Sequence, residues 1–171
     1  LEFRRVLFRS SEGKTMRALI QRVSSASVST REGNVNSIDQ GFCILLGVGP
    51  NDTEEIAEKL WSKISKLRIF EDQNGKTNLS LSDVSGAVLL VSQFTLYADC
   101  HKGNRPSFTK GASPDLANRL YEYFAQLVRD DGVELKTGWF GAMVEVSLTN
   151  SGPFTLWLDT DDLVKQQIRS K

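Results

Sequence analysis

Two short polar segments hold the residues of this chain whose types and spacing could do chemistry. The first, Ser92-Gln93-Phe94-Thr95-Leu96, follows the apolar run at 87–91. The second, Asn150-Ser151-Gly152-Pro153, interrupts two runs that are typical of β-strands. Neither segment has a strong acid, base, thiol or metal ligand in a familiar arrangement. If the buried strand ends near Phe94 and Thr95, their exposed amides could hold an oxyanion, so an active site here would depend on backbone groups and shape.

Each segment also has a purely structural interpretation. The hydroxyls of Ser92 and Thr95 could satisfy nearby backbone groups at the end of a strand. Gly152-Pro153 could be a turn that connects two strands, and a cis bond is uncommon even before proline. The residues by themselves leave both interpretations open.

The other candidate motifs predict little chemistry. The segment Gly47-Val48-Gly49-Pro50 lacks the Gly-Lys-Ser/Thr ending of a phosphate-binding loop, so it predicts a strand-to-helix turn. His101 is the only histidine, and a catalytic triad would have to include it. Cys100 lies beside it, but beyond Cys43, which lies in a buried apolar run, no other soft ligand completes a zinc site. We expect no metal and no cofactor.

The polar loop expected at 98–112 combines basic and aromatic residues. Lys102, Arg105 and Lys110 surround Phe108, a pattern that can follow an RNA backbone and stack a base. A solvated surface loop would have the same composition, and the sequence does not decide between the two.

The composition is that of an ordinary globular domain. The 171 residues are 40% hydrophobic and 25% charged, with 21 basic and 21 acidic side chains. No apolar run approaches the roughly 20 residues that cross a bilayer, so a membrane partner is not expected. Two cysteines are too few for a disulfide framework, which fits a cytoplasmic location.

We expect residues 1–15 to be a non-native, disordered extension and Met16 to be the natural start. Arginines interrupt the segment where a signal peptide would be continuously apolar, and it resembles a translated cloning scar. Without this segment the chain is slightly acidic, so bulk attraction to nucleic acid is not expected. RNA contact would need a local basic patch, and DNA is not an expected partner.

The hydrophobic pattern predicts a single α+β domain over 16–160. It favours largely antiparallel β-sheets with two main amphipathic helices. The expected strands cover 17–28, 35–38, 42–48, 86–94, 133–137, 142–149 and 154–158.

Two N-terminal signals predict where the helices begin. Asp52-Thr53-Glu54-Glu55 resembles a capping box, and apolar residues at helical spacing follow it to Leu67. Ser113-Pro114 has the order of an N-cap and a first-turn proline, and the second helix is expected to end near Asp131. Residues 161–171 are expected to be a tail with a loosely held helix, and the aspartates near its start predict a solvated chain end in preference to a metal site.

Seven segments in register resemble the D-aminoacyl-tRNA deacylase family, across nearly all of 16–160. The resemblance implies that family's fold and a homodimeric hydrolase of translation quality control. Such an enzyme cleaves the ester of D-aminoacyl-tRNA, and of mischarged glycyl-tRNA, and releases the amino acid and the tRNA. The segments are 16–23, 45–48, 67–70, 78–81, 92–99, 105–108 and 150–153.

The resemblance also implies roles for individual residues. The family's Ser-Gln-x-x-Leu motif maps onto 92–96, which makes Ser92, Gln93, Phe94 and Thr95 the catalytic positions. Gly152-Pro153 maps onto a cis Gly-Pro that enters the partner subunit's pocket and rejects L-amino acids, and Arg22 maps onto the arginine that orients it. The 2′-hydroxyl of the terminal ribose is implied to assist the attacking water.

The resemblance also bears on tRNA recognition. Lys102, Arg105 and Lys110 are the candidate tRNA contacts, but the family is commonly more basic around 100–105. The preferred D-amino acid, the preferred tRNA and the docking path do not follow from the sequence.

Two other functions fit the same residues. The chain could be an RNA- or protein-binding module that keeps the fold without turnover. It could also be a small-molecule esterase that uses His101. Hydrolysis of D-tyrosyl-tRNA with L-tyrosyl-tRNA spared would exclude the first, and an active His101→Ala variant would exclude the second.

Overall fold

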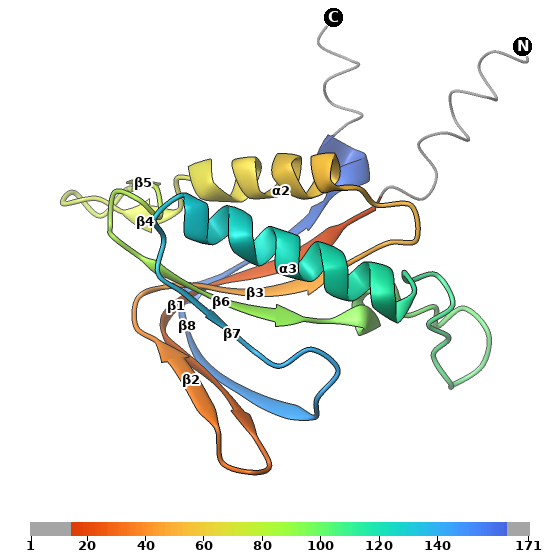
Figure 1. Ribbon diagram of the computed structural model, residues 1–171. Helices are drawn as coiled ribbons and strands as arrows, with labels where there is room; N and C mark the ends of the chain where they lie inside the picture. The colour runs from red at the N-terminus through yellow and green to blue at the C-terminus, as the bar shows by residue number, and fades with distance from the viewer. Residues whose placement is uncertain (1–14, 164–171) are drawn as a thin grey trace, which may run out of the picture.

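A computed structural model describes residues 15–163 and has a curved sheet with two helices on one face (Figure 1). The expected extension at 1–15 and the expected tail therefore fall almost entirely outside the described residues. The strands are β1 (Arg17–Thr30), β2 (Val35–Ile38), β3 (Gly41–Gly47), β4 (Phe70–Glu71), β5 (Thr77–Leu79), β6 (Ala87–Ser92), β7 (Leu135–Thr137) and β8 (Val144–Asp159). The helices are α2 (Glu54–Lys66), α3 (Pro114–Asp130) and the short 3-10 turn η1 (Phe94–Tyr97).

The long strand β1 organises the main sheet. Its first half pairs with β3, its second half pairs with β2, and β8 pairs with it along almost its whole length, all antiparallel. The pairs β3–β6 and β6–β7 are parallel. Parallel neighbours need a long crossover, and the chain supplies one through α2 and another through η1 and α3. The predicted α+β class, with antiparallel pairing in the majority, is confirmed.

The continuous apolar runs of β3 and β6 arise because both faces of these strands are buried. On one face they pack against the two helices, and Phe42, Ile44 and Leu90 belong to that core. On the other face Cys43 and Leu89 belong to a second cluster. Cys43 is fully buried, as predicted, and burial raises the pKa of its thiol to about 11.

The two strands expected at 142–149 and 154–158 form one strand, β8, so Gly152-Pro153 lies within a strand and is not the connecting turn that was one of its two interpretations. The strand continues because β1 pairs with both halves, from Val144 to Asp159. The intervening residues bulge out of the ladder. The strand expected at 86–94 ends at Ser92, because the chain then turns into η1.

The start of α2 differs from the predicted capping box by one residue. Thr53, not Asp52, is the N-cap, and its hydroxyl accepts a hydrogen bond from the N–H of Ile56. Asp52 turns inward, and its carboxylate accepts a 2.5 Å hydrogen bond from the N–H of Gly49. Its second oxygen is buried and has no hydrogen-bond partner among residues 15–163. Burial raises the pKa of Asp52 to about 7.

This buried carboxyl predicts a specific dependence of stability on pH. The folded-state pKa of Asp52 is raised, so the contribution of this carboxyl to the stability of the fold is complete below its ordinary pKa near 4. That contribution is lost as the pH rises through 7. Between pH 5 and pH 8, we expect the free energy of unfolding of the wild type to fall by roughly 2–3 kcal/mol more than that of Asp52→Asn. Urea denaturation of both proteins at the two pH values measures this, with the exposed Asp39→Asn as the control. Equal pH dependence in wild type and Asp52→Asn would contradict it.

No helix within residues 15–163 is both long and apolar enough to span a membrane.

Candidate active site

The motif residues 92–97 lie where β6 leaves the sheet. The N–H of Gln93 donates a 2.8 Å hydrogen bond to the carbonyl of Leu46, which extends the β3–β6 ladder by one residue. The chain then enters η1, whose Tyr97 side chain is buried and donates its hydroxyl to the carbonyl of Thr15. Gly47 makes room for this ring, since a Cβ there would lie 2.7 Å from it. The turn is therefore packed firmly against the end of β3.

The first two amides of η1 are not used within the fold. Among the described residues, neither the N–H of Phe94 nor that of Thr95 donates a hydrogen bond. Such unused amides are expected in the first turn of any helix. The Phe94 side chain is 63% exposed and Thr95 is exposed as well. Two neighbouring backbone donors are thus available to an anionic group.

The Thr95 hydroxyl has an amide neighbour instead of a base. It accepts a hydrogen bond from the side-chain amide of Gln93, and an amide does not take up a proton near neutral pH. Within residues 15–163, no histidine, aspartate or glutamate hydrogen-bonds to this hydroxyl. The arrangement lacks the partner that activates a threonine nucleophile.

The Gly152-Pro153 segment is a bulge on β8. Gln21 pairs with Thr155 and Val23 pairs with Asn150, so the four residues 151–154 lie opposite the single residue Arg22. A bulge pushes the extra residues out of the ladder, and Pro153 has no N–H to contribute to it. The Gly152–Pro153 peptide bond is cis, and both residues are exposed.

The side chain of Arg22 contacts this bulge and holds it in place. Arg22 is 7% exposed, and its guanidinium donates to the carbonyl of Ser151 at 2.9 Å and to that of Ile69 at 2.6 Å. It also lies over the ring of Phe154, 4.8 Å from the centroid. Gly152 has a φ of +137°, and a Cβ there would lie 3.0 Å from the guanidinium. The structure therefore brings Arg22 and Gly152 together.

Asn150 holds the two ends of the bulge, a role that the sequence did not reveal. Its side-chain oxygen accepts a 2.7 Å hydrogen bond from the N–H of Phe154, and its side-chain nitrogen donates to the hydroxyl of Thr155 at 2.7 Å. Only its position beside the glycine and proline could have signalled this. Figure 1 places the strand β8 that carries it against β1.

Within one chain, the bulge and the motif are far apart. The bulge lies opposite Arg22, which pairs with Phe42 on β3, whereas Ser92 on β6 pairs with Leu46, four residues further along β3. The two sites are also three strand spacings apart in the sheet. With about 3.3 Å per residue and about 4.8 Å per strand, their separation is about 20 Å.

The basic loop reaches the motif through an aromatic contact. The rings of Phe94 and Phe108 meet edge to face, with centroids 5.1 Å apart. Lys110 forms an ion pair with Asp99 at 3.2 Å, and the same carboxylate accepts the backbone N–H of His101. The His101 N–H and the Lys110 ammonium hold the pKa of Asp99 below its usual value.

The other two predicted tRNA contacts stand apart from this ion pair. Lys102 and Arg105 are exposed, and neither forms an ion pair within the described part of the chain.

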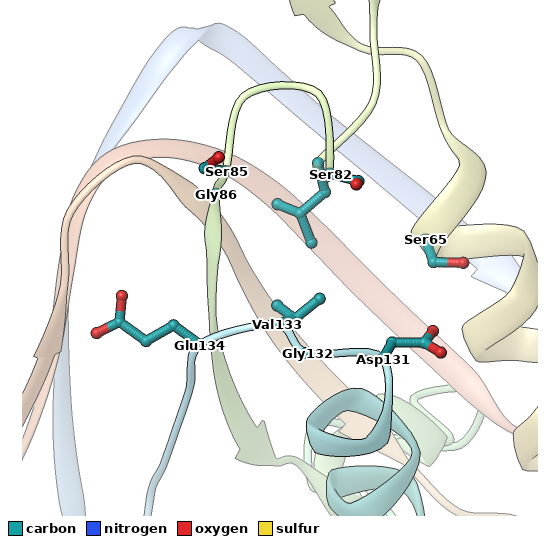
Figure 2. Close-up of a pocket in the computed structure, with 9 residues that line it drawn as sticks. Ser65, Ser82, Ser85, Gly86, Asp131, Gly132, Val133 and Glu134 are labelled. Atoms are coloured by element: carbon teal, nitrogen blue, oxygen red, sulfur yellow. The ribbon is translucent and has the colours of Figure 1, made fainter.

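A cavity of about 480 Å³ lies away from all these residues, beside the C-terminal ends of α2 and α3 (Figure 2). The carboxylates of Asp131 and Glu134 point away from each other there, and Asp131 accepts a 2.6 Å hydrogen bond from the Trp61 indole. None of the predicted site residues lines this cavity. Its lining consists of Ser65, Leu81, Ser82, Ser85, Gly86, Asp131, Gly132, Val133 and Glu134.

Comparison with known proteins gives the same family as the motifs. The family model described as D-Tyr-tRNA(Tyr) deacylase matches residues 19–159. The D-aminoacyl-tRNA deacylase of Bacillus pumilus (strain SAFR-032) is 54% identical over 147 residues, which are 86% of this chain and 100% of that protein.

Two solved structures share the fold. The "c-Myc DNA Unwinding Element Binding Protein" is 37% identical with a TM-score of 0.77, over 83% of this chain and 97% of that one. A structure described as "a probable eukaryotic D-amino acid tRNA deacylase" has a TM-score of 0.76, over 85% of this chain and 99% of that one. At 18% identity it supports the fold alone.

These matches define the class of protein as a deacylase, an enzyme of the hydrolase group. The chain belongs to the D-aminoacyl-tRNA deacylase family, and the resemblance found in the sequence is confirmed.

Proposed function

We propose that this protein hydrolyses the ester bond of D-aminoacyl-tRNA, and of mischarged glycyl-tRNA, as a cytoplasmic homodimer. One observation carries the proposal. The unused amides of Phe94 and Thr95 lie about 20 Å from residues 152–153, the exposed tip of the bulge, within one chain. A single aminoacyl group is too small to touch both. A second copy can bring its own tip to the motif of the first, and the two features then form one pocket.

The chemistry that this pocket needs is modest because an aminoacyl ester is already reactive. Attack by water produces a tetrahedral oxyanion, and the two unused amides of η1 can donate to it. Each well-placed donor is worth about 3 kcal/mol in the transition state. The 2′-hydroxyl of the terminal ribose assists the water, so a protein base is not required. Thr95 has no base beside it within residues 15–163, and in this proposal it is not the nucleophile.

Discrimination between D- and L-amino acids follows from a rigid backbone wall at Gly152-Pro153. Arg22 and Asn150 hold the bulge, so it does not swing aside for a side chain. Carbonyl groups of the tip can accept hydrogen bonds from the substrate's α-ammonium group. With the ammonium and the ester both held, an L-residue directs its Cβ into the wall, a D-residue directs it outward, and glycine has no Cβ.

Recognition of the tRNA is assigned to the loop at 98–112. Lys102 and Arg105 are exposed cations that can meet phosphates, and the Phe94–Phe108 pair offers an aromatic surface for a terminal base. Lys110 contributes less charge because Asp99 pairs with it.

The experiment that tests the activity compares D-tyrosyl-, L-tyrosyl- and glycyl-tRNA as substrates. We expect hydrolysis of the first and third and sparing of the second. Thr95→Ala is expected to keep activity within about tenfold of the wild type, because its side chain is not the nucleophile. The exposed His101→Ala serves as the matched control and is expected to lose little.

Three outcomes would contradict this proposal in different ways. Failure of the wild type on D-tyrosyl-tRNA and glycyl-tRNA would favour a binding module with the same fold. Complete loss of activity in Thr95→Ala, together with an acyl-enzyme trapped in the wild type, would make Thr95 a covalent nucleophile. Loss in His101→Ala would favour an esterase mechanism through the histidine.

A further inference from the structure

Arg17, at the start of β1, connects the motif turn to the end of β8. Its Nη1 donates a 2.8 Å hydrogen bond to the carbonyl of Leu96, and its Nε lies 3.2 Å from the Asp159 carboxylate. The same guanidinium lies over the Tyr97 ring at 4.7 Å and over the Trp157 ring at 5.7 Å. Asp159 is thus part of a half-buried ion pair, so the expected solvation of the chain-end aspartates does not hold for Asp159, whereas Asp162 is exposed.

The two residues of η1 that Arg17 contacts follow directly after the two with unused amides. Phe94, Thr95, Leu96 and Tyr97 make up the whole turn. In a turn this short, the direction of the Leu96 carbonyl and the position of the Tyr97 ring restrict the preceding peptide planes. The contact from Arg17 therefore limits how the Phe94 and Thr95 N–H groups can point.

We propose that Arg17 is a positioning residue for the reaction, which aims the Phe94 and Thr95 amides through the Leu96 carbonyl and the Tyr97 ring. The proposal rests on the function proposed above, in which these amides stabilise the oxyanion. Arg17 does not touch the substrate in this role. Preorganised donors lose much of their effect when their direction changes by a small angle.

A guanidinium suits this place better than an ammonium. Its separate N–H groups donate at the same time to Leu96 and to Asp159, while its flat face stacks on an aromatic ring. A lysine would bring the charge as a single point and could not keep this geometry. The pairing with Asp159 also fixes the guanidinium, so the turn is tied to a strand and not to a mobile side chain.

The test compares Arg17→Ala, Arg17→Lys and the control Arg68→Ala. Arg68 is a suitable control because it also donates to a backbone carbonyl, that of Asn78 at 2.8 Å, away from the motif. We expect kcat for D-tyrosyl-tRNA to fall about 10- to 100-fold in Arg17→Ala, with KM changed less than threefold. Arg17→Lys should recover part of the loss, and Arg68→Ala should match the wild type.

A second measurement reads the amides directly. We expect the ¹H–¹⁵N resonances of Phe94 and Thr95 to shift in Arg17→Ala and to stay in place in Arg68→Ala, at a temperature where both variants are folded. An unchanged kcat in Arg17→Ala, unmoved resonances, or equal changes in Arg68→Ala would overturn the proposal. If the wild type does not hydrolyse D-tyrosyl-tRNA, the proposed function fails, and the resonances alone then support or overturn the positioning role.

Discussion

Replacing Phe94 with proline is expected to reduce kcat for D-tyrosyl-tRNA about 100-fold beyond the loss caused by Phe94→Ala. Both variants lose the exposed ring, but only proline also removes the N–H that we assign to the oxyanion. Proline fits this position because Phe94 is the first residue of η1, and Gln93 before it, with φ −141° and ψ 86°, is not in the helical region that a following proline disfavours. Single-turnover hydrolysis at saturating enzyme measures the difference.

The comparison between the two substitutions separates the backbone from the side chain. Thermal unfolding of both variants checks that the turn still folds. Equal activity of Phe94→Pro and Phe94→Ala would mean that the Phe94 N–H does not stabilise the transition state. The proposed role of this amide as an oxyanion donor would then be wrong.

Replacing Gly152 with alanine is expected to lower kcat/KM for D-tyrosyl-tRNA about 100-fold, because the tip would be displaced from the pocket that we propose it completes. The new Cβ would lie 3.0 Å from the Arg22 guanidinium and 3.1 Å from the N–H of Phe154, and φ of +137° strains any L-residue. Gly33→Ala is the control, since its φ is also positive, at +94°, but no atom lies within 4 Å of its Cβ. Wild-type kcat/KM in Gly152→Ala would contradict the role of the tip.

Mixing the Phe94→Pro and Gly152→Ala variants tests whether two subunits share one site. Each mixed dimer would combine the intact motif of one subunit with the intact tip of the other. Random exchange between equal amounts is then expected to restore about a quarter of wild-type activity. If each chain acted alone, mixing would restore nothing.

The sequence predicted the helices and the buried strands well because their signals are local. The N-cap and proline at Ser113-Pro114 start α3 as expected, and the apolar run at 87–91 is a strand buried on both faces. The start of α2 was wrong by one residue because Asp52 and Thr53 both suit an N-cap. Only the burial of the Asp52 carboxylate beside Gly49 distinguishes them.

The motifs of the candidate site were predictable from the sequence, but the contacts that hold them in place were not. The sequence by itself determined the two motifs and the family, and it predicted the residues that would meet the substrate, because these signals lie in short, ordered segments. The tertiary structure alone decided that four residues bulge out opposite Arg22, and that Arg17 reaches the motif turn. Arg22 and the carbonyl it supports are 129 residues apart in the chain, and Arg17 and the Leu96 carbonyl are 79 apart. Contacts of this kind depend on strand register, which the folded sheet sets and no local pattern encodes.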